Sequence, residues 1–398
     1  MAINQTKVIV MGGSLGGLTT ALFLRKAGCQ VSVFERASTP LTSQGAGIVL
    51  NPATVRYFTQ QGTPDLHQIS VASQWVRYLD NQGRTSAERY APYRFSSYNA
   101  IYRALLAAFG TDHYRLGQMI TDFTQDSTGV TVRFSSGEQA HCDLLVCADG
   151  IRSTARRLLL PDVHLSYAGY VAWRGMVSER TLGATTFALL RDAISYHLMD
   201  HSHMLTYPIP VVDPARGETQ PFINWLWYRN VPLGPPLDAL MTDPHGTVHD
   251  VALSPGAVRV ENVATLREAA ATLPPLLAQL IHRTERPFLQ VIMDCEVPRM
   301  KFGRVCLIGD AAFVARPHAA AGTAKAAEDG WQLSQTLLAC NGDIDAALAL
   351  WETKQLAVGQ AVVARTREAG RRSQVESSWQ MGEPLPFGLY AVGDSVMA

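Results

Sequence analysis

The sequence predicts an α/β fold that joins a parallel-sheet lobe, an interleaved and mostly antiparallel β-sheet lobe, and C-terminal helices. Three observations predict it. The chain opens as strand, tight turn, helix and strand, and such βαβ units imply a parallel sheet. Short apolar strands of the same kind recur around residues 145 and 305. The segments between these strands mostly alternate apolar and polar residues, which is typical of antiparallel strands.

Length and composition fit a protein of two lobes, because 398 residues exceed what one hydrophobic core usually organises. The 34 basic residues equal the 34 acidic ones, which argues against nucleic acid or an anionic membrane as the main partner. No segment approaches the roughly 20 apolar residues that span a bilayer, and the N-terminus lacks the pattern of a signal peptide. Six scattered cysteines without a CxxC pair favour a reduced, cytoplasmic protein.

The elements of the parallel-sheet lobe follow from hydrophobic periodicity. A strand is expected at residues 7–11, a helix at 15–27 and a second strand at 30–35, with Gly28 ending the helix. Later segments of this lobe are expected to be a helix at 101–109, strands near 119–123, 130–134, 144–148 and 304–309, and helices from Gly322 to about Ala369.

The other lobe is expected to be antiparallel. Residues 70–98 alternate around a turn at 81–83 and predict a hairpin, and residues 167–291 return to short alternating strands separated by loops rich in Pro and Gly. The domains are therefore predicted as a discontinuous nucleotide-binding domain at 1–69, 99–165 and 292–375, a substrate-binding domain at 70–98 and 166–291, and a tail at 376–398.

The first turn of the chain carries a dinucleotide-binding pattern. It reads GGSLGG from Gly12 to Gly17, which matches G-x-G-x-x-G except for Ser14 at the middle glycine. Gly12 permits the tight turn, Gly17 lets the helix approach the strand, and the helix N-terminus that begins at Leu15 offers N–H groups to a pyrophosphate. Glu35 ends the second strand, where an acid accepts hydrogen bonds from a ribose. On this turn alone, an ordinary βα connection or an NAD dehydrogenase remains possible.

Two further motifs follow apolar strands. The sequence CADGIRSTAR runs from Cys147 to Arg156, and RVCLIGDAA runs from Arg304 to Ala312. The second motif continues as FVARPHAAAG to Gly322 and leads into a helix. Taken singly, the Asp at each strand end could simply cap the next turn.

Together and in this order, the three motifs resemble those of FAD-dependent aromatic hydroxylases of the p-hydroxybenzoate hydroxylase class. The resemblance extends from Val8 to about Leu338. It implies that the parallel-sheet lobe is a Rossmann-like FAD-binding lobe. It also implies that Asp310 binds the ribityl chain of FAD, that Asp149 belongs to a motif contacting FAD and NAD(P)H, and that the backbone of residues 320–323 lies against the isoalloxazine ring.

The chain departs from the family pattern at three places. Phe313 stands where many relatives have His, and Ala320-Ala321-Gly322 replaces a G-Q-G loop. Tyr98 stands at the position of a frequent FAD-contacting arginine, which makes Arg103, one turn further on, a candidate for the FAD phosphates. The predicted FAD-contacting residues are Gly12, Ser14, Leu15, Gly17, Glu35, Arg36, Gln44, Arg103, Met119, Asp149, Asp310, Ala320, Ala321, Gly322 and Thr323.

The resemblance implies hydroxylation of a small hydroxylated aromatic or N-heteroaromatic ring, with hydroxypyridine-specific members being the most similar. NADH or NADPH would reduce FAD transiently, and O₂ would react through a flavin C4a-hydroperoxide. The protein would hold the ring close and exclude water. No metal site is expected, and a homodimer is expected from the family likeness.

The substrate is expected to lie between the flavin and the antiparallel lobe. His318, next to Pro317, is the leading polar contact and proton acceptor because histidine ordinarily titrates near neutrality, although a structural role is equally compatible. Tyr207 and His197 are weaker candidates on hairpin strands. In the strand at 222–228, Trp225 and Trp227 share one face and Asn224, Leu226 and Tyr228 the other, and the sequence leaves open which face lines the pocket.

Three alternatives stay open. The same chemistry could act on a hydroxynicotinate or salicylate-like acid, for which Arg316 could supply a cationic pocket. The protein could be a non-hydroxylating flavoprotein, although cysteine ligands for an iron–sulfur partner are absent from the sequence. It could also be a non-catalytic protein that retains FAD as a structural ligand.

Overall fold

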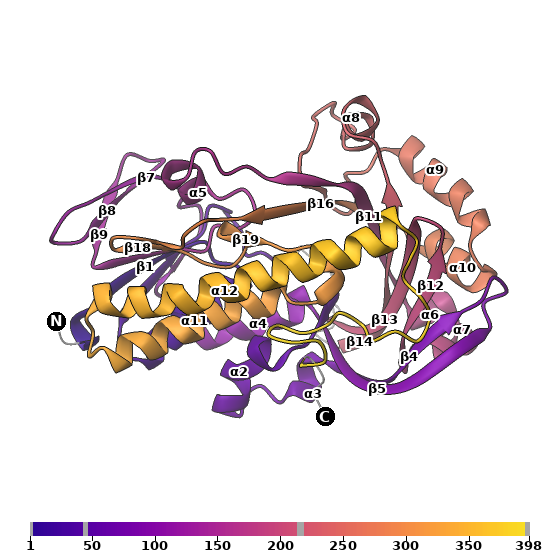
Figure 1. Ribbon diagram of the computed structural model, residues 1–398, viewed down its shortest axis with the longest axis horizontal. Coiled ribbons are helices and arrows are strands. Elements are labelled where there is room, and N and C mark those ends of the chain that lie inside the picture. The colour runs from indigo at the N-terminus through magenta and orange to yellow at the C-terminus, as the bar shows by residue number, and fades with distance from the viewer. Residues whose placement is uncertain (1–2, 43–46, 213–218, 395–398) are drawn as a thin grey trace.

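The computed structural model describes the chain at residues 3–42, 47–212 and 219–394. It is a mixed α/β structure in which a parallel-sheet lobe and an antiparallel lobe lie end to end, with two long helices running along one side (Figure 1). Within the described residues, no helix is both long and apolar enough to cross a bilayer.

A six-stranded sheet forms the centre of the first lobe, in the order β17-β18-β10-β1-β2-β6. All neighbours are parallel except β17 and β18. Its strands are β1 (Lys7–Met11), β2 (Gln30–Phe34), β6 (Tyr114–Arg115), β10 (Leu144–Cys147), β17 (Lys301–Phe302) and β18 (Val305–Leu307). The central strands β1 and β10 are almost wholly apolar and buried, as strands covered on both faces must be. The three predicted motifs therefore leave the carboxyl ends of adjacent strands.

A three-stranded antiparallel sheet flanks this lobe. It comprises β7 (Ile120–Gln125), β8 (Val130–Phe134) and β9 (Gln139–Cys142).

A ten-stranded sheet forms the second lobe, in the order β15-β16-β11-β14-β13-β12-β4-β5-β3, with β19 paired to β16. Its strands are β3 (Gly47–Val49), β4 (Val71–Leu79), β5 (Thr85–Ser97), β11 (Ser166–Ser178), β12 (Ala193–Met199), β13 (Ser202–Val212), β14 (Thr219–Asn230), β15 (Ala252–Leu253), β16 (Phe288–Glu296) and β19 (Phe313–Val314). The pairs are antiparallel apart from β12 with β4. The hairpin predicted around residues 81–83 is present, with Gly83 at a φ of +78°.

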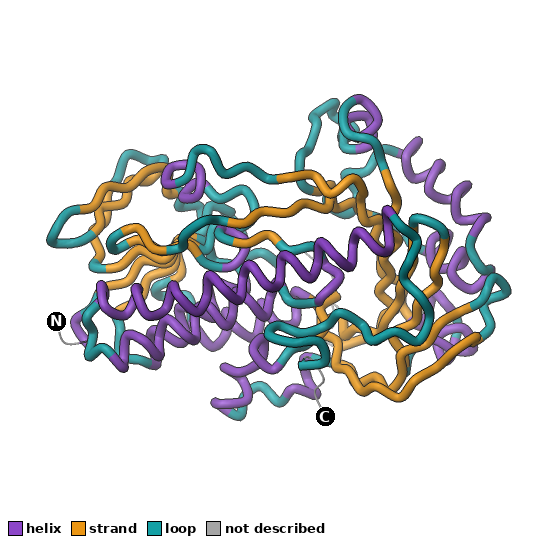
Figure 2. The backbone as a smooth tube through the Cα atoms, viewed as in Figure 1, coloured by secondary structure: helices purple, strands orange, loops and turns teal. Residues whose placement is uncertain are grey.

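Helices cover both lobes (Figure 2). The first lobe and its flank carry α1 (Leu15–Lys26), α2 (Pro52–Gln61), α3 (Leu66–Ile69), α4 (Tyr98–Phe109), α5 (Thr154–Leu159), α11 (Gly322–Ala339) and α12 (Ile344–Gly370). Single-turn helices are η1 (Ile3–Gln5), η2 (Ala270–Thr272), η3 (Gly309–Ala311), η4 (Pro317–Ala319) and a π-turn, η5 (Arg371–Val375). A Cβ at Gly16 of α1 would lie 2.9 Å from Ala326 Cβ, so α1 and α11 pack closely because both residues are small.

Two expectations need adjustment. The stretch between residues 167 and 291 also holds helices that alternation did not predict: α6 (Glu179–Leu182), α7 (Ala184–Leu190), α8 (Pro235–Leu240), α9 (Val260–Ala269) and α10 (Pro275–Arg283). The strand expected at 304–309 ends at Leu307, because Gly309 takes a φ of +54° and starts the turn η3. The predicted domain boundaries stay a prediction. The strand β3 joins the ten-stranded sheet although it comes from the segment assigned to the first domain.

Candidate active site

The glycine turn after β1 is shaped by close backbone approach. Gly12 has a φ of +106°, and a Cβ there would lie 2.3 Å from the Ala148 carbonyl oxygen. A Cβ at Gly17 would lie 1.9 Å from the Gly12 carbonyl oxygen. Both positions therefore require glycine, and the turn brings the N-terminus of α1 against the carboxyl end of β10.

Ser14 is the N-cap residue of α1, but its side chain does not cap the helix. Its hydroxyl instead forms a 2.7 Å hydrogen bond with the hydroxyl of Tyr98. Two of the residues at which this chain departs from the family pattern, Ser14 and Tyr98, are thus in contact. Burial raises the pKa of Tyr98, so its hydroxyl is neutral and can donate.

Glu35 is buried and holds the same turn from the side. Its carboxylate accepts hydrogen bonds of 2.9 Å from the backbone N–H groups of Gly13 and Ala37. A carboxylate has about four acceptor positions, so capacity for a ribose hydroxyl remains. Arg36, Arg103 and Met119 are exposed and do not line the central cavity described below. The predicted contact Gln44 lies outside the described residues.

Asp149 organises the second motif internally. Its carboxylate accepts hydrogen bonds from the Ser153 hydroxyl and the Thr154 N–H, each at 2.6 Å, and from the Ala155 N–H at 3.2 Å. These bonds hold the beginning of α5, on which Arg156 lies.

Arg156 connects the second motif to the third. Its buried guanidinium donates 3.0 Å hydrogen bonds to the carbonyl groups of Asp310 and Ala311 and also bonds the Ile151 carbonyl. On the other side, Asp329 of α11 accepts a 2.9 Å hydrogen bond from Gly309 N–H. The loop that carries Asp310 is therefore fixed from both sides.

The side chain of Asp310 is open to the cavity, and the protein around it raises its pKa to about 6 by burial, partly offset by the charge of Arg156. Hydrogen bonds donated by the hydroxyl groups of a ligand would stabilise the ionised form of this carboxyl group.

A cavity of about 500 Å³ extends from the glycine turn between the lobes to the C-terminal segment. The predicted site residues that line it are Ser14, Leu15, Tyr207, Asp310, Pro317, His318, Ala320, Ala321, Gly322 and Thr323. The N-cap residue of α11, Ala321, makes no side-chain cap hydrogen bond, and the first turn of the helix includes Gly322 and Thr323. The N–H groups of that turn thus face the cavity at the positive end of an 18-residue helix, a favourable place for negative charge.

These features fit FAD. The glycine turn and the N-terminus of α1 suit a diphosphate, the open carboxylate of Asp310 suits a polyol chain, and the N-terminus of α11 suits the electron-accepting edge of the isoalloxazine ring.

The antiparallel lobe supplies the opposite wall of the cavity, through alternate residues of neighbouring strands. Leu226 and Tyr228 of β14 line it, which answers the question left open by the sequence. Trp225 and Trp227 lie on the other face, in the core, and Trp225 Nε1 donates to Thr284 at 2.9 Å. The tryptophans therefore support the wall.

Arg174 on β11 is a buried cation in this wall, 7% exposed. It donates a 2.9 Å hydrogen bond to Gln290 Oε1, while its Nε has no hydrogen-bond partner among the described residues. Within the part of the chain that the structure describes, no ion pair joins Arg174 to an acid. Burial raises the pKa of Tyr207, which also lines the wall, to about 12, and Arg174 opposes that shift.

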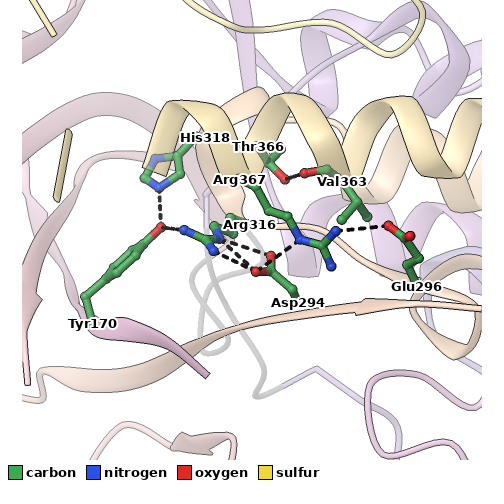
Figure 3. Close-up of polar contacts among 8 residues, drawn as sticks. All are labelled: Tyr170, Asp294, Glu296, Arg316, His318, Val363, Thr366 and Arg367. Carbon is green, nitrogen blue, oxygen red and sulfur yellow. Dashed lines mark hydrogen bonds and ion pairs between the residues drawn. The ribbon is translucent and has the colours of Figure 1, made fainter. Parts of the chain in front are cut away.

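His318 is buried, and its Nε2 is 2.7 Å from the Tyr170 hydroxyl (Figure 3). Burial, and secondarily the charge of Arg316, lowers the pKa of His318 to about 3. The titration near neutrality expected from sequence is therefore not what this environment gives, and the imidazole is neutral at pH 7.

Arg316, the expected cation for an acidic substrate, is already paired. Its guanidinium binds both carboxylate oxygens of Asp294, with the closest contact at 2.7 Å, and Arg367 of α12 reaches the same carboxylate at 3.5 Å. Arg367 also contacts Glu296 at 3.1 Å. Figure 3 shows this chain of charges linking β16 and α12 to the loop of His318.

His197 does not line the cavity. It is buried, and its Nδ1 lies 3.1 Å from the Leu79 carbonyl oxygen, which makes it a bridge between strands. Sequence reasoning instead missed Arg174, Tyr196, His203 and Trp379 as cavity residues. The alternation of His203 with Leu205 and Tyr207 on β13 is the signal that could have identified that face.

The FAD binding domain family matches residues 5–180 and 291–366, and an FAD binding domain-like family matches residues 167–294. The chain is 38% identical to 2,6-dihydroxypyridine 3-monooxygenase of Paenarthrobacter nicotinovorans, over 99% of this chain and 98% of that protein. It is 28% identical to aurachin C monooxygenase/isomerase of Stigmatella aurantiaca, over 94% and 91% of the two chains.

Among solved structures, 2,6-dihydroxypyridine-3-hydroxylase from Arthrobacter nicotinovorans matches with a TM-score of 0.92 and 38% identity, covering 97% of this chain and 98% of that one. The motifs, the fold and these matches agree, and the chain belongs to the FAD-binding family of FAD-dependent aromatic monooxygenases.

Proposed function

We propose that this protein hydroxylates a small hydroxylated aromatic or N-heteroaromatic ring resembling 2,6-dihydroxypyridine, using O₂ and electrons from NADH or NADPH. The observation that carries the proposal is the cavity itself. Its wall includes aromatic side chains and Arg174, with which no acid pairs among the described residues, and the loop of Pro317 to Thr323 lines the same cavity. The 38% identical relative is named for this activity on 2,6-dihydroxypyridine.

FAD would be held by the glycine turn with Ser14 and Glu35, by Asp310, and by the first turn of α11. When bound, FAD supplies the storage of electrons and the activation of oxygen. The N–H groups of Gly322 and Thr323 would stabilise negative charge on the ring system of FAD.

Arg174 would stabilise the ionised hydroxyl of the substrate. A buried guanidinium attracts an anion strongly because the surroundings screen charge poorly. Ionisation makes the ring more electron-rich, which favours attack on an electrophilic oxygen. Tyr207, whose pKa burial raises to about 12, stays protonated near neutrality and can donate a hydrogen bond to the ring substituents.

His318 would position the substrate rather than remove a proton from it. With its pKa lowered to about 3, it is a poor proton acceptor at pH 7. Its contact with Tyr170 fixes the imidazole, and the pairing of Arg316 with Asp294 fixes the loop on both sides of Pro317.

The test measures NADH and NADPH consumption by the FAD-loaded protein with and without 2,6-dihydroxypyridine, while peroxide and hydroxylated product are quantified in parallel. We expect strong stimulation with product matching the reductant consumed. Stimulation that ends in peroxide would mean that the ring binds but is not the substrate, and absence of stimulation would refute the hydroxypyridine assignment.

Hydroxylation of a hydroxynicotinate or salicylate-like acid is the second candidate, and the same observation favours it. Arg174 could meet a carboxylate as well as a ring oxyanion, whereas Arg316 is already neutralised by Asp294. A panel of hydroxylated aromatic acids in the same assay distinguishes the two candidates, because the preferred substrate gives the highest fraction of product per reductant.

Three further features belong to the proposal. The nicotinamide would bind only transiently, because the chain carries a single dinucleotide fingerprint. A reducing, cytoplasmic location is consistent with six unpaired cysteines. A homodimer is proposed from the family likeness, and light scattering coupled to gel filtration tests it by measuring the molar mass against 43.4 kDa per chain.

A further inference from the structure

The segment after η5, residues 376–394, contributes to the wall of the cavity. It turns back below α12 and runs toward α2 and α4 (Figure 1). Five of its residues line the cavity: Trp379, Glu383, Pro384, Pro386 and Phe387. The predicted tail is therefore part of the candidate active site.

This segment is fixed along its length. Arg372 binds both carboxylate oxygens of Glu383, at 2.6 and 2.7 Å. The Gly388 N–H donates to the Ala319 carbonyl at 3.1 Å, which ties the segment to the loop of His318. Phe387 is buried and packs edge-to-face on Tyr93, with ring centroids 5.5 Å apart.

Trp379 lines the cavity on the side of His203. Its indole packs edge-to-face on Tyr196 and His203, with ring centroids 5.2 and 5.1 Å apart. The His203 ring lies 5.6 Å from the His318 ring and 4.6 Å from the Tyr228 ring. The order along this wall is thus His318, His203, Trp379.

His203 gives Trp379 a rigid support. The Gln374 side chain donates to His203 Nδ1 at 3.1 Å, and Asn230 donates to the Gln374 carbonyl at 2.8 Å. His203 is buried and not protonated, because burial and the nearby His318 lower its pKa. Because hydrogen bonds hold His203 in place, the indole that packs on it has little freedom to move.

Trp379 and Ser373 border a second, smaller pocket of about 160 Å³ as well as the main cavity. The other residues that line this pocket are Leu198, Met199, Asp200, Ser202 and Ser377. The indole therefore lies where the main cavity adjoins additional space that a second fused ring could use.

We propose that Trp379 is a specificity-determining residue, whose indole limits the substrate cavity and restricts it to substrates with a single aromatic ring. The inference rests on the proposed function, because it deepens the account of which rings that site accepts. A truncated side chain at residue 379 joins the two spaces, removes the aromatic end wall and admits water.

The experiment uses FAD-loaded full-length protein carrying Trp379→Ala, with Met381→Ala as the matched control. Met381 belongs to the same segment but is 55% exposed and does not line the cavity. Dissociation constants for 2,6-dihydroxypyridine and for the bicyclic 2-hydroxyquinoline are measured from the change in flavin absorbance. Product and peroxide per NAD(P)H consumed are measured as a second readout.

For Trp379→Ala we expect the ratio of the two dissociation constants to shift at least about tenfold toward the bicyclic ring, with a larger share of reductant lost as peroxide. Met381→Ala should behave as the unsubstituted protein. If Trp379→Ala does not retain FAD, Trp379→Phe replaces it, with an expected shift of about threefold.

An unchanged ratio in a variant that retains FAD and its melting temperature would overturn the inference while leaving the proposed function intact. If the unsubstituted protein binds neither ring and none of the hydroxylated aromatic acids, the proposed function fails, and this inference fails with it.

Discussion

Replacing Arg156 by Met should destabilise the protein and weaken FAD binding together. Arg156 is 3% exposed, and its guanidinium donates hydrogen bonds to three backbone carbonyl groups, those of Ile151, Asp310 and Ala311. Methionine fills much of the same space but donates no hydrogen bond. The loop that presents Asp310 to the cavity then loses its support on one side.

The magnitude follows from these contacts. A hydrogen bond from a charged donor contributes about 1.5–3 kcal/mol, and an acceptor left unsatisfied in the interior costs about 1–3 kcal/mol. The variant avoids the desolvation cost of the buried guanidinium, which offsets part of this loss. We expect a net loss of about 2–4 kcal/mol in the free energy of unfolding. With an unfolding entropy of about 2.1 cal/mol/K per residue, this loss lowers the Tm by roughly 2–5 °C for a chain of 398 residues.

Differential scanning calorimetry of the protein without FAD measures the Tm, and titration of the same protein with FAD measures the dissociation constant. We expect FAD affinity to fall at least about tenfold, since the displaced loop carries Asp310, the carboxylate that we propose binds the ribityl chain. Arg157→Met is the control, because Arg157 is the next residue but is exposed. A change in Tm below about 1 °C together with unaltered FAD affinity would refute the reasoning.

Three other predictions test single groups. FAD affinity should rise with pH through about 6, because the pKa of Asp310 is raised to about 6 and the hydroxyl groups of FAD favour its ionised form. In a titration of Kd against pH, Asp310→Asn should flatten this dependence. Arg174→Met should weaken ring binding at least about tenfold, with Arg174→Lys retaining more affinity; equal Kd values in all three proteins would exclude a charge interaction. Tyr98→Phe should weaken FAD binding about fivefold, and adding Ser14→Gly should then have little further effect, which a double-mutant cycle measures.

The parallel-sheet lobe could be predicted from sequence because its rules are local. The turn after β1 needs Gly12 and Gly17 for reasons of backbone space, and strand, turn and helix are adjacent in the chain. The carboxyl ends of parallel strands then bring motifs near residues 12, 149 and 310 to one edge of the sheet. No knowledge of side-chain packing was needed for this step.

The substrate side could be predicted only in outline. We propose a functional role for Arg174 because no acid among the described residues pairs with it, whereas Arg316 is paired with Asp294, which lies 22 residues earlier in the chain. The sequence alone does not indicate which of these two arginines forms an ion pair with an acid. The pKa of His318 could not be foreseen either, since its lowering comes from burial among distant strands.

The role of the C-terminal segment could not be predicted from the sequence either. Its composition suggests a loop, and no periodicity assigns it to a core. It nevertheless contributes to the cavity because Arg372 and the carbonyl of Ala319 hold it in place and because Trp379 packs on His203. Ring size is then determined by a side chain outside both predicted domains. Substitutions in this segment alone should therefore change which rings bind, without any change in the residues that we propose hold the cofactor.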